Sequence, residues 1–273
     1  MDYIKEALSK AKVSLDERPG SGKLAKPETS RLKPMPASPA VPGPVWTPRQ
    51  IQLNPRQLER SRIVSATMTD PKHLAFNLLR TRVRATLTEN RWKSIAVTSP
   101  TPRCGKTTIA LNLAFSLARA PDCKSVLVDL DLKKPAIAHA LGVEVICSIG
   151  AFLQGKAAAE DCFIQVTPNL IIGLNSDRIH ESSELMQGRR MKDLFDFIDS
   201  SFAPDVVLFD LPPMLPTDDT LAFLPQVDTA LLVVAAGTTK AAEAAECEGQ
   251  ISHLNKLLGV ALNKSDSHEE EYY

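Results

Sequence analysis

Short apolar segments recur along the chain from about Arg91 to Asp266, and segments of helical periodicity separate them. Strand-sized apolar runs lie at Ser94 to Ser99, Ser125 to Asp129, Asn169 to Gly173, Val206 to Asp210, Thr229 to Ala235 and Leu257 to Leu262. Helical spacing is found at Pro71 to Thr86, Thr107 to Ala120, Ser183 to Ser200 and Thr239 to Lys256. Repeated strand, crossover helix and strand predict an α/β fold, a parallel sheet flanked by helices. Ligands of such sheets bind beyond the carboxyl ends of the strands.

Residues 1–60 follow a different pattern. Apolar residues at helical spacing predict a short amphipathic helix from Tyr3 to Val13, which is either a docking peptide or an ordinary chain terminus. From Arg18 to Gln57 frequent prolines interrupt any regular element, so we expect an extended, disordered linker. We therefore divide the chain into this N-terminal segment (1–60), an α/β domain (61–266) and an acidic tail (267–273).

The composition fits one sizeable domain, and its balanced charge means that a nucleic-acid or membrane partner would have to be bound by a local surface. Lys plus Arg and Asp plus Glu both number 32, so no overall charge draws the chain to nucleic acid or to an anionic membrane. No apolar run approaches the ~18 residues that a membrane-spanning helix needs. The polar start of the chain is unlike a secretion signal, and we expect a cytoplasmic protein.

The cysteines and histidines offer no metal site by their spacing. The chain has 5 cysteines without a C-x-x-C pair, which suits free thiols in a reducing compartment. They are Cys104, Cys123, Cys147, Cys162 and Cys247. The histidines are equally scattered, so zinc is not expected.

The turn after the strand at Ser94 to Ser99 has the chemistry of a phosphate-binding loop. Its sequence, SPTPRCGKTT, covers residues 99–108 and leads directly into an apolar helix. Gly105 marks a turn whose backbone N–H groups and helix dipole suit a phosphate. Lys106 adds a cation for the outer phosphates, and the Thr107 hydroxyl can bind Mg²⁺. Pro100 stands where the strict pattern has its first glycine, and the alternative is an ordinary surface turn with a helix cap.

Three aspartates follow the predicted strands at their carboxyl ends. Asp129 and Asp131 end one strand two residues apart, and Asp210 ends another just before two prolines. Each alone would be explained as a turn residue. Together with the phosphate loop they predict ATP and Mg²⁺ as cofactors, because phosphoryl transfer needs carboxylates to hold the metal and to activate the attacking oxygen.

These segments resemble the motifs of a known family. TSPTPRCGKTT, VLVDLDLKKP and VLFDLPP resemble the Walker A, A′ and B motifs of bacterial tyrosine kinases that control capsule and exopolysaccharide synthesis. The resemblance extends from Arg62 to Lys264 and includes SSELM at 182–186 and the acidic pair Asp218 and Asp219. It implies a P-loop fold of the MinD/ParA type. The short N-terminal helix and proline-rich stretch are most similar to the stand-alone, exosortase-associated form.

The resemblance implies a role for each matched residue. Lys106 would bind the β and γ phosphates and Thr107 and Asp210 would hold Mg²⁺. Asp129 would activate the tyrosine hydroxyl from within the metal shell, and Asp131 would support that shell. The residues implied to bind ATP are Pro102, Arg103, Cys104, Gly105, Lys106, Thr107, Thr108 and Asn263, the last of them at the adenine.

The acceptors in this family are tyrosines clustered at the C-terminus. This chain ends in EEEYY, so Tyr272 and Tyr273 are the implied acceptors. The alternative is an acidic terminus that contains aromatics by chance. The resemblance also implies a membrane chain-length regulator whose cytoplasmic tail activates the kinase and recruits it to the membrane, a cognate phosphatase, self-association, and no nucleic-acid partner.

Several positions depart from the family pattern. Arg103 replaces a glycine, which would cost about 1–2 kcal/mol if that position needs φ > 0. Cys104 replaces a common glutamate, and Lys133 replaces an arginine. The ring-assembly pattern of one glutamate and two arginines reads Leu74, Asn77 and Arg80 here, so only the last position matches.

Two other functions remain open. A partitioning ATPase of the same superfamily would carry a second lysine in the phosphate loop, and Thr101 occupies that position. A nucleotide-bound scaffold with little or no kinase activity would tolerate the altered loop and ring pattern. The polar residues of the phosphate site are all of the type that catalysis needs, which favours the kinase.

Overall fold

The computed structural model of the chain describes residues 47–176, 178–179 and 181–265. The expected helix at Tyr3 to Val13, most of the proline-rich linker, His180 and the expected acceptors Tyr272 and Tyr273 lie outside these residues. Everything below concerns the unit that begins at Val45.

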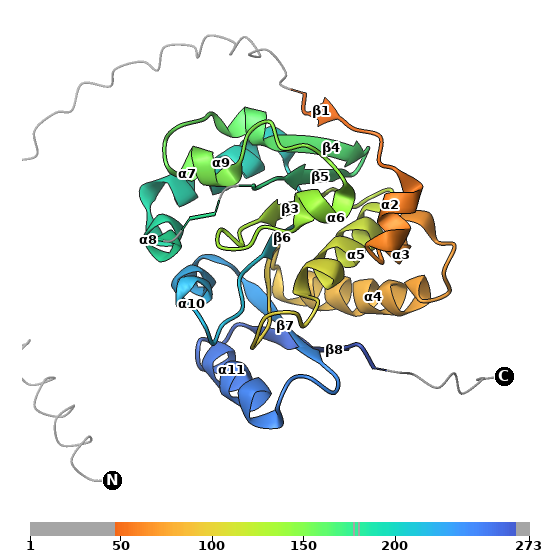
Figure 1. Cartoon of the computed structure of the whole chain (residues 1–273), viewed down its shortest axis with the longest axis vertical. Helices are drawn as coiled ribbons and strands as arrows, with labels where there is room; N and C mark the ends of the chain where they lie inside the picture. Colours follow the sequence, from red (N-terminus) through yellow and green to blue (C-terminus); the bar gives the residue numbers. More distant parts are fainter. Residues whose placement is uncertain (1–46, 177, 180, 266–273) are drawn as a thin grey trace, which may run out of the picture. The chain divides into compact units, whose positions relative to one another are not determined.

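One sheet organises the described residues, and its order is β1-β4-β5-β3-β6-β2-β7-β8 (Figure 1). The strands are β1 (Arg49–Gln50), β2 (Ser94–Thr98), β3 (Ser125–Asp129), β4 (Phe163–Thr167), β5 (Leu170–Gly173), β6 (Val206–Asp210), β7 (Thr229–Ala235) and β8 (Leu257–Asn263). Neighbouring strands are parallel except β4 and β5, which are antiparallel. The α/β fold with a mainly parallel sheet is confirmed.

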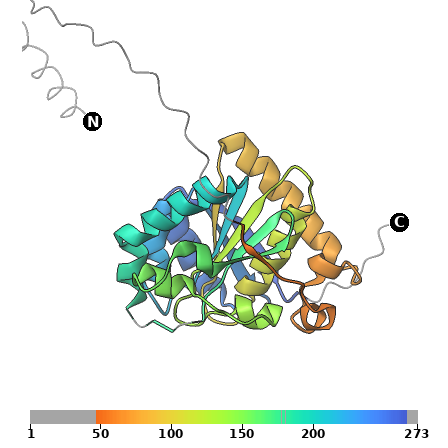
Figure 2. The same ribbon diagram turned by 90° about the horizontal axis from the view of Figure 1, so that it is seen from above.

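Helices cover both faces of this sheet, which Figure 2 shows as a central layer. On one face lie α2 (Pro55–Arg60), α3 (Val64–Thr67), α4 (His73–Asn90), α5 (Lys106–Ala118) and α6 (Ile137–Leu141). On the other lie α7 (Ile149–Leu153), η2 (Ala159–Cys162), α8 (Ser182–Gln187), α9 (Arg189–Phe202), α10 (Asp219–Phe223), η3 (Leu224–Gln226) and α11 (Ala241–His253).

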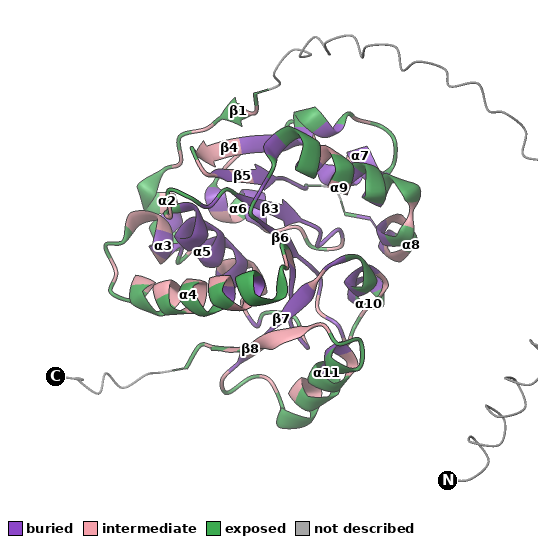
Figure 3. Cartoon of the chain, turned by 180° about the vertical axis from the view of Figure 1, so that it is seen from behind, coloured by how far each residue is buried: buried purple, intermediate pink, exposed green. Residues whose placement is uncertain are grey.

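The alternation of side chains along each strand divides the core in two. In β6, Leu208 packs into the cluster under α4 and α5, while Val207 and Phe209 pack into the cluster under α7 to α11. The central strands are buried on both faces (Figure 3), which explains why their sequences are continuously apolar. Helix α5 is buried from Ile109 to Ala118, because α4 covers the side that faces away from the sheet.

Two differences from the expected elements have local causes. The strand β4 was not expected, because FIQVT is short and lacks the uniformly apolar character of the central strands. The single helix expected from Ser183 to Ser200 is two helices. Gly188 separates them with an extended backbone, at φ −71° and ψ 160°, and serves as the C-cap of α8 and the N-cap of α9.

The expectation of an irregular linker up to Gln57 is wrong at its C-terminal end. Arg49 and Gln50 form the edge strand β1, where Pro48 precedes the pairing with β4. Pro55 begins α2 rather than interrupting it, and the Asn54 side chain accepts a hydrogen bond from the Arg56 backbone N–H. Proline lacks a donor that the first turn of a helix does not use, so it is well placed there.

Candidate active site at the phosphate loop

The phosphate loop connects β2 to α5 at the carboxyl end of the sheet. Gly105 caps α5 with φ 91°, and a Cβ atom at this position would collide with the side-chain amide of Asn263. The positive φ favours glycine here, and any other residue would also displace the Asn263 side chain. Arg103 also has a positive φ of 68°. The position where relatives are expected to carry glycine therefore does need the left-handed conformation, which arginine adopts at a cost.

A buried ionic cluster lies where α5 begins. The Lys106 ammonium lies 2.8 Å from Asp131 Oδ2 and 3.6 Å from Asp210 Oδ1. The Thr107 hydroxyl donates a hydrogen bond of 2.6 Å to Asp210 Oδ2. Burial acts to lower the pKa of Lys106, but the charges of Asp210 and Asp131 outweigh it and raise that pKa above its usual value. The lysine is therefore a firmly charged cation held by two carboxylates.

Asp129 lies beside Asp210 because the two residues are direct partners in the β3–β6 pairing. Both of its oxygens are occupied by backbone: Oδ1 accepts from the Asp131 N–H, and Oδ2 accepts from the N–H groups of Ala136 and Ile137 at 3.1 Å. Burial, followed by the charge of Asp210, raises the pKa of Asp129 to about 8. Burial likewise raises the pKa of Asp210, against the opposing effects of Lys106 and Thr107.

The end of β8 holds the phosphate loop from the other side. The Asn263 side-chain amide donates to the Cys104 carbonyl at 2.9 Å, and the Lys264 ammonium donates to the Arg103 carbonyl at 2.7 Å. The Cys104 side chain is buried against Thr101 and Thr239. Burial acts to raise the pKa of this thiol, but hydrogen bonds with Thr239 and Thr101 outweigh it, so the pKa is lowered.

The residues fit a magnesium–nucleotide complex. Asp210 Oδ1 is buried and has no hydrogen-bond partner in the described structure, and three carboxylates face one ammonium. Hard oxygen donors with excess negative charge suit Mg²⁺. Within the described ranges, however, no three acidic, histidine or cysteine side chains form a metal site by themselves. If Thr107 and Asp210 bind Mg²⁺, the phosphate oxygens of a nucleotide would supply further ligands.

The structure brings most of the expected site residues together. Lys106, Thr107, Asp129, Asp131 and Asp210 form one cluster around the turn at Gly105. Pro102 and Arg103 are exposed on the outer side of the loop, while Thr108 is half-buried and its carbonyl accepts from Asn112. Asn263 contacts the loop backbone, and its expected contact with adenine stays a prediction.

Sequence reasoning missed two features near this site. The Lys264 side chain contacts the phosphate loop, and no sequence motif predicts this contact. Asp219 is completely buried and lies 3.5 Å from Lys133, although the sequence gives it only as part of an acidic pair. The only sequence feature that points to this ion pair is the position of Lys133, two residues after Asp131.

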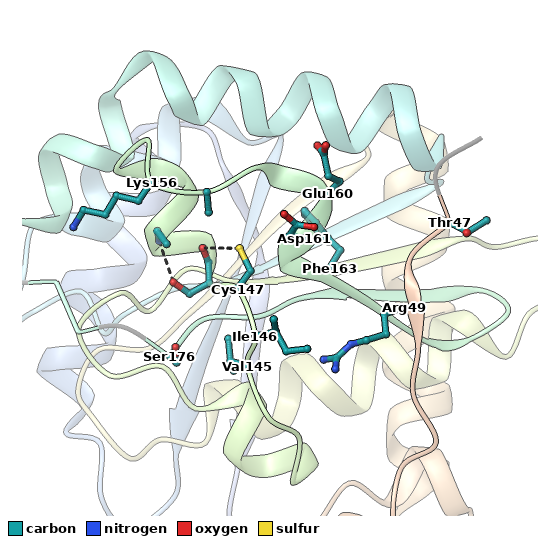
Figure 4. A pocket seen from close by; sticks show the side chains of 13 residues that line it. Thr47, Arg49, Val145, Ile146, Cys147, Lys156, Glu160, Asp161, Phe163 and Ser176 are labelled. Carbon is teal, nitrogen blue, oxygen red and sulfur yellow. Dashed lines mark hydrogen bonds between the residues drawn. The ribbon is translucent and has the colours of Figure 1, made fainter. Parts of the chain in front are cut away.

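A hollow of about 980 Å³ lies away from the phosphate loop, and no residue of that loop lines it. Figure 4 shows the side chains that line it. Charged side chains of both signs line it, including Arg49, Lys156, Glu160 and Asp161, but no expected site residue does. Cys147 at its wall is paired in a disulfide with Cys162. The expectation of free thiols is therefore wrong for these two cysteines, because the segment between them, which contains α7 and η2, folds back and brings them within a Cα separation of 4.7 Å. Cys104, Cys123 and Cys247 are free.

Comparisons with known proteins agree with this geometry. No protein-family model matches the chain. The chain is 30% identical over 213 residues to the tyrosine-protein kinase YwqD of Bacillus subtilis, across 76% of this chain and 89% of YwqD. The chain belongs to the bacterial tyrosine-protein kinase family. As a member, it is a protein-tyrosine kinase.

Other relatives of this kinase extend the comparison. It is 31% identical over 183 residues to the succinoglycan biosynthesis transport protein ExoP of Rhizobium meliloti, across 64% of this chain and 22% of ExoP. The crystal structure of the chimerical protein CapA2B2 matches with a TM-score of 0.69 and 25% identity, over 81% of this chain and 94% of that one. The fold is also that of MinD from Pyrococcus horikoshii with Mg-ADP, at TM-score 0.54 and 21% identity over 64% and 72% of the two chains.

None of the helices in the described part of the kinase is both long and apolar enough to cross a membrane.

Arg103→Gly is expected to raise the free energy of unfolding by about 1 kcal/mol, because glycine adopts φ 68° without the steric cost of a Cβ atom. Urea denaturation of the nucleotide-free protein measures this. Arg103→Ala is the matched control, since it removes the side chain but keeps the Cβ atom. An equal gain in both variants would show that backbone strain is not the cause.

Asp129 makes the folded protein less stable as pH rises. Its pKa of about 8 exceeds the unfolded value of 3.8, so the folded state binds a proton that the unfolded state releases. The stabilisation is therefore present below about pH 4 and is lost as pH approaches 8. Asp129→Asn should flatten the fall in unfolding free energy between pH 6 and pH 8 by up to ~1.4 kcal/mol per pH unit. The slope is the readout, because asparagine also loses hydrogen bonds at every pH. Parallel slopes for the two proteins would contradict the raised pKa.

Proposed function

We propose that this protein is an ATP- and Mg²⁺-dependent tyrosine autokinase of exopolysaccharide or capsule synthesis, which phosphorylates Tyr272 and Tyr273 at its own C-terminus. The observation that carries the proposal is the cluster of Lys106, Thr107 and Asp210 at the N-terminus of α5, with Asp129 at the end of β3 and Asp131 in the loop that follows it. The name of ExoP, a succinoglycan biosynthesis protein, supports the polysaccharide role.

Each side chain has a defined task in this reaction. Lys106 leaves Asp131 to bind the outer phosphates, where its charge stabilises the transferring group. Thr107 and Asp210 would hold Mg²⁺, which would neutralise phosphate charge. Asp131 would support this metal site. Asp129 accepts the proton of the attacking tyrosine in its ionised form, which its raised pKa disfavours in the nucleotide-free site and which the charge of a bound Mg²⁺ would favour.

The partners follow from the same proposal. A membrane chain-length regulator activates the kinase through its cytoplasmic tail and recruits it to the inner face of the membrane, and a phosphatase reverses the modification. The stand-alone, exosortase-associated form is the subtype that the sequence features support, and the segment from Met1 to Val13 is the docking element for the regulator.

Self-association also belongs to the proposal, and two surfaces support it. Helix α4 exposes Leu74 by 61% and Leu78 by 54%, one turn apart, in a segment (47–93) with ten Lys or Arg and three Asp or Glu. A hollow of about 650 Å³ beside α11 is lined by Leu221 and Leu254 and includes Glu246. The surfaces belong to opposite faces of the sheet, so joining them between copies gives a head-to-tail contact.

The kinase test is incubation with Mg-ATP, with and without the regulator's cytoplasmic tail, followed by mass spectrometry of phosphotyrosine. Label at Tyr272 and Tyr273 is expected. It should disappear in Lys106→Ala, which loses phosphate binding, and in Tyr272→Phe/Tyr273→Phe, which lacks acceptors but keeps the nucleotide site. Release of inorganic phosphate without any labelled tyrosine would support the rival ATPase switch.

Leu78→Glu is expected to shift sedimentation of the kinase toward the monomer, because a carboxylate would be desolvated in an apolar contact. The matched control is Ile146→Glu, which places the same charge on a side chain that is 72% exposed near the hollow in Figure 4. A sedimentation profile that is unchanged by Leu78→Glu, or changed equally by both variants, would contradict this interface.

A further inference from the structure

Asp219 is a buried carboxylate that the reaction described above does not use. It is the first residue of α10 and is 0% exposed. Its Oδ1 accepts a hydrogen bond of 2.8 Å from the Ser182 hydroxyl at the start of α8. Its Oδ2 is buried without a hydrogen-bond partner in the described structure and lies 3.5 Å from the Lys133 ammonium. Its neighbour Asp218 is exposed and makes no capping hydrogen bond.

A carboxylate in this environment needs a compensating cation. Removing an ionised group from water is costly unless it is paired and hydrogen-bonded, and one hydroxyl donor compensates only in part. Lys133 is the cation that faces it, and the side chain of this lysine is 32% exposed. A buried charge that serves only to link α8 and α10 could be replaced by a neutral hydrogen-bonding residue. The charge therefore points to a role for Asp219 at Lys133.

Lys133 lies in the loop that carries two carboxylates of the active site. Asp131 precedes it by two residues and contacts Lys106, and Asp129 caps the start of α6 on the other side of the loop. The loop is tied to the segment before α8 at a second point, where the Ile179 N–H donates to the Leu132 carbonyl at 2.8 Å. The Lys133–Asp219 pair adds the only side-chain ion pair between this loop and α10 among the described residues.

We propose that Asp219 is a positioning residue for phosphoryl transfer. By holding Lys133, its carboxylate fixes the loop from Asp129 to Lys133 against α8 and α10, so that Asp129 and Asp131 keep their orientation when Lys106 leaves Asp131 for the phosphates. Ser182 fixes the carboxylate itself. This inference rests on the proposed kinase function, and it assigns Asp219 to the chemical step rather than to nucleotide binding, because Asp219 does not touch the phosphate loop.

The test compares Asp219→Asn with Asp218→Asn in the full-length protein. The first substitution keeps the size of the side chain and an oxygen for Ser182 but removes the charge that holds Lys133. We expect the rate of tyrosine phosphorylation at saturating Mg-ATP to fall at least ~10-fold, while the dissociation constant of Mg-ADP by calorimetry changes less than ~2-fold. Asp218→Asn, on the exposed neighbour, should leave both quantities unchanged.

Variants of Lys133 separate positioning from a general loss of structure. Lys133→Met should lower the rate as much as Asp219→Asn, and the double variant should be no slower than either single variant, because both remove one interaction. Lys133→Arg can still reach the carboxylate and should retain activity within ~3-fold. All rates are measured well below the thermal midpoint of each variant, because Lys133→Met leaves Asp219 without its cation and is expected to lower that midpoint.

Three results would overturn the inference. They are a rate within ~2-fold of wild type in Asp219→Asn, a parallel loss of rate and Mg-ADP affinity, and multiplicative effects in the double variant. Phosphate release is measured alongside tyrosine labelling in every sample. If the wild-type protein releases phosphate but labels no tyrosine, the kinase proposal fails, and the role of Asp219 is judged from its effect on hydrolysis.

Discussion

The ion cluster at Lys106 is the constraint on which the rest of this site depends. An ammonium at the first position of α5 is held by Asp131 and Asp210, and a third carboxylate, Asp129, lies directly across the β3–β6 pairing from Asp210. Adjacent parallel strands bring their carboxyl ends to the same edge of a sheet, so the fold alone gathers these charges. One cation cannot balance three ionised carboxylates, and the raised pKa values of Asp129 and Asp210 show that the cluster holds a proton more firmly than exposed aspartates do.

The loops around the cluster hold its side chains in a defined geometry. Asp129 is oriented by backbone N–H groups of α6, and the phosphate loop is held in place by β8 through Asn263 and Lys264. Arg103 accepts a left-handed backbone within that loop, where strain is tolerated because the surrounding contacts fix the chain. The start of α6, the end of β8 and the phosphate loop itself therefore hold the site in place. The strain of this arrangement lies in the backbone at Arg103.

Much of this arrangement could be predicted from the sequence, and the failures have physical causes. The central strands and the position of the loop between β2 and α5 were predicted correctly, because buried parallel strands are continuously apolar and the loop carries an ordered motif. The strand β4 and the break at Gly188 were missed because short or mixed segments carry little periodicity. Cys147 and Cys162 pair only through tertiary structure, which spacing does not reveal. In the sequence Asp219 is one of two adjacent acids, and only its burial beside Lys133 distinguishes it from Asp218.

The attachment of β8 to the phosphate loop has a mechanical meaning. Lys264 follows the last strand residue and is bonded through its side chain to the loop that receives the nucleotide, while the chain continues from its backbone into the sequence that ends in two tyrosines. A displacement of the chain that follows β8 would therefore act on the phosphate loop through a single residue.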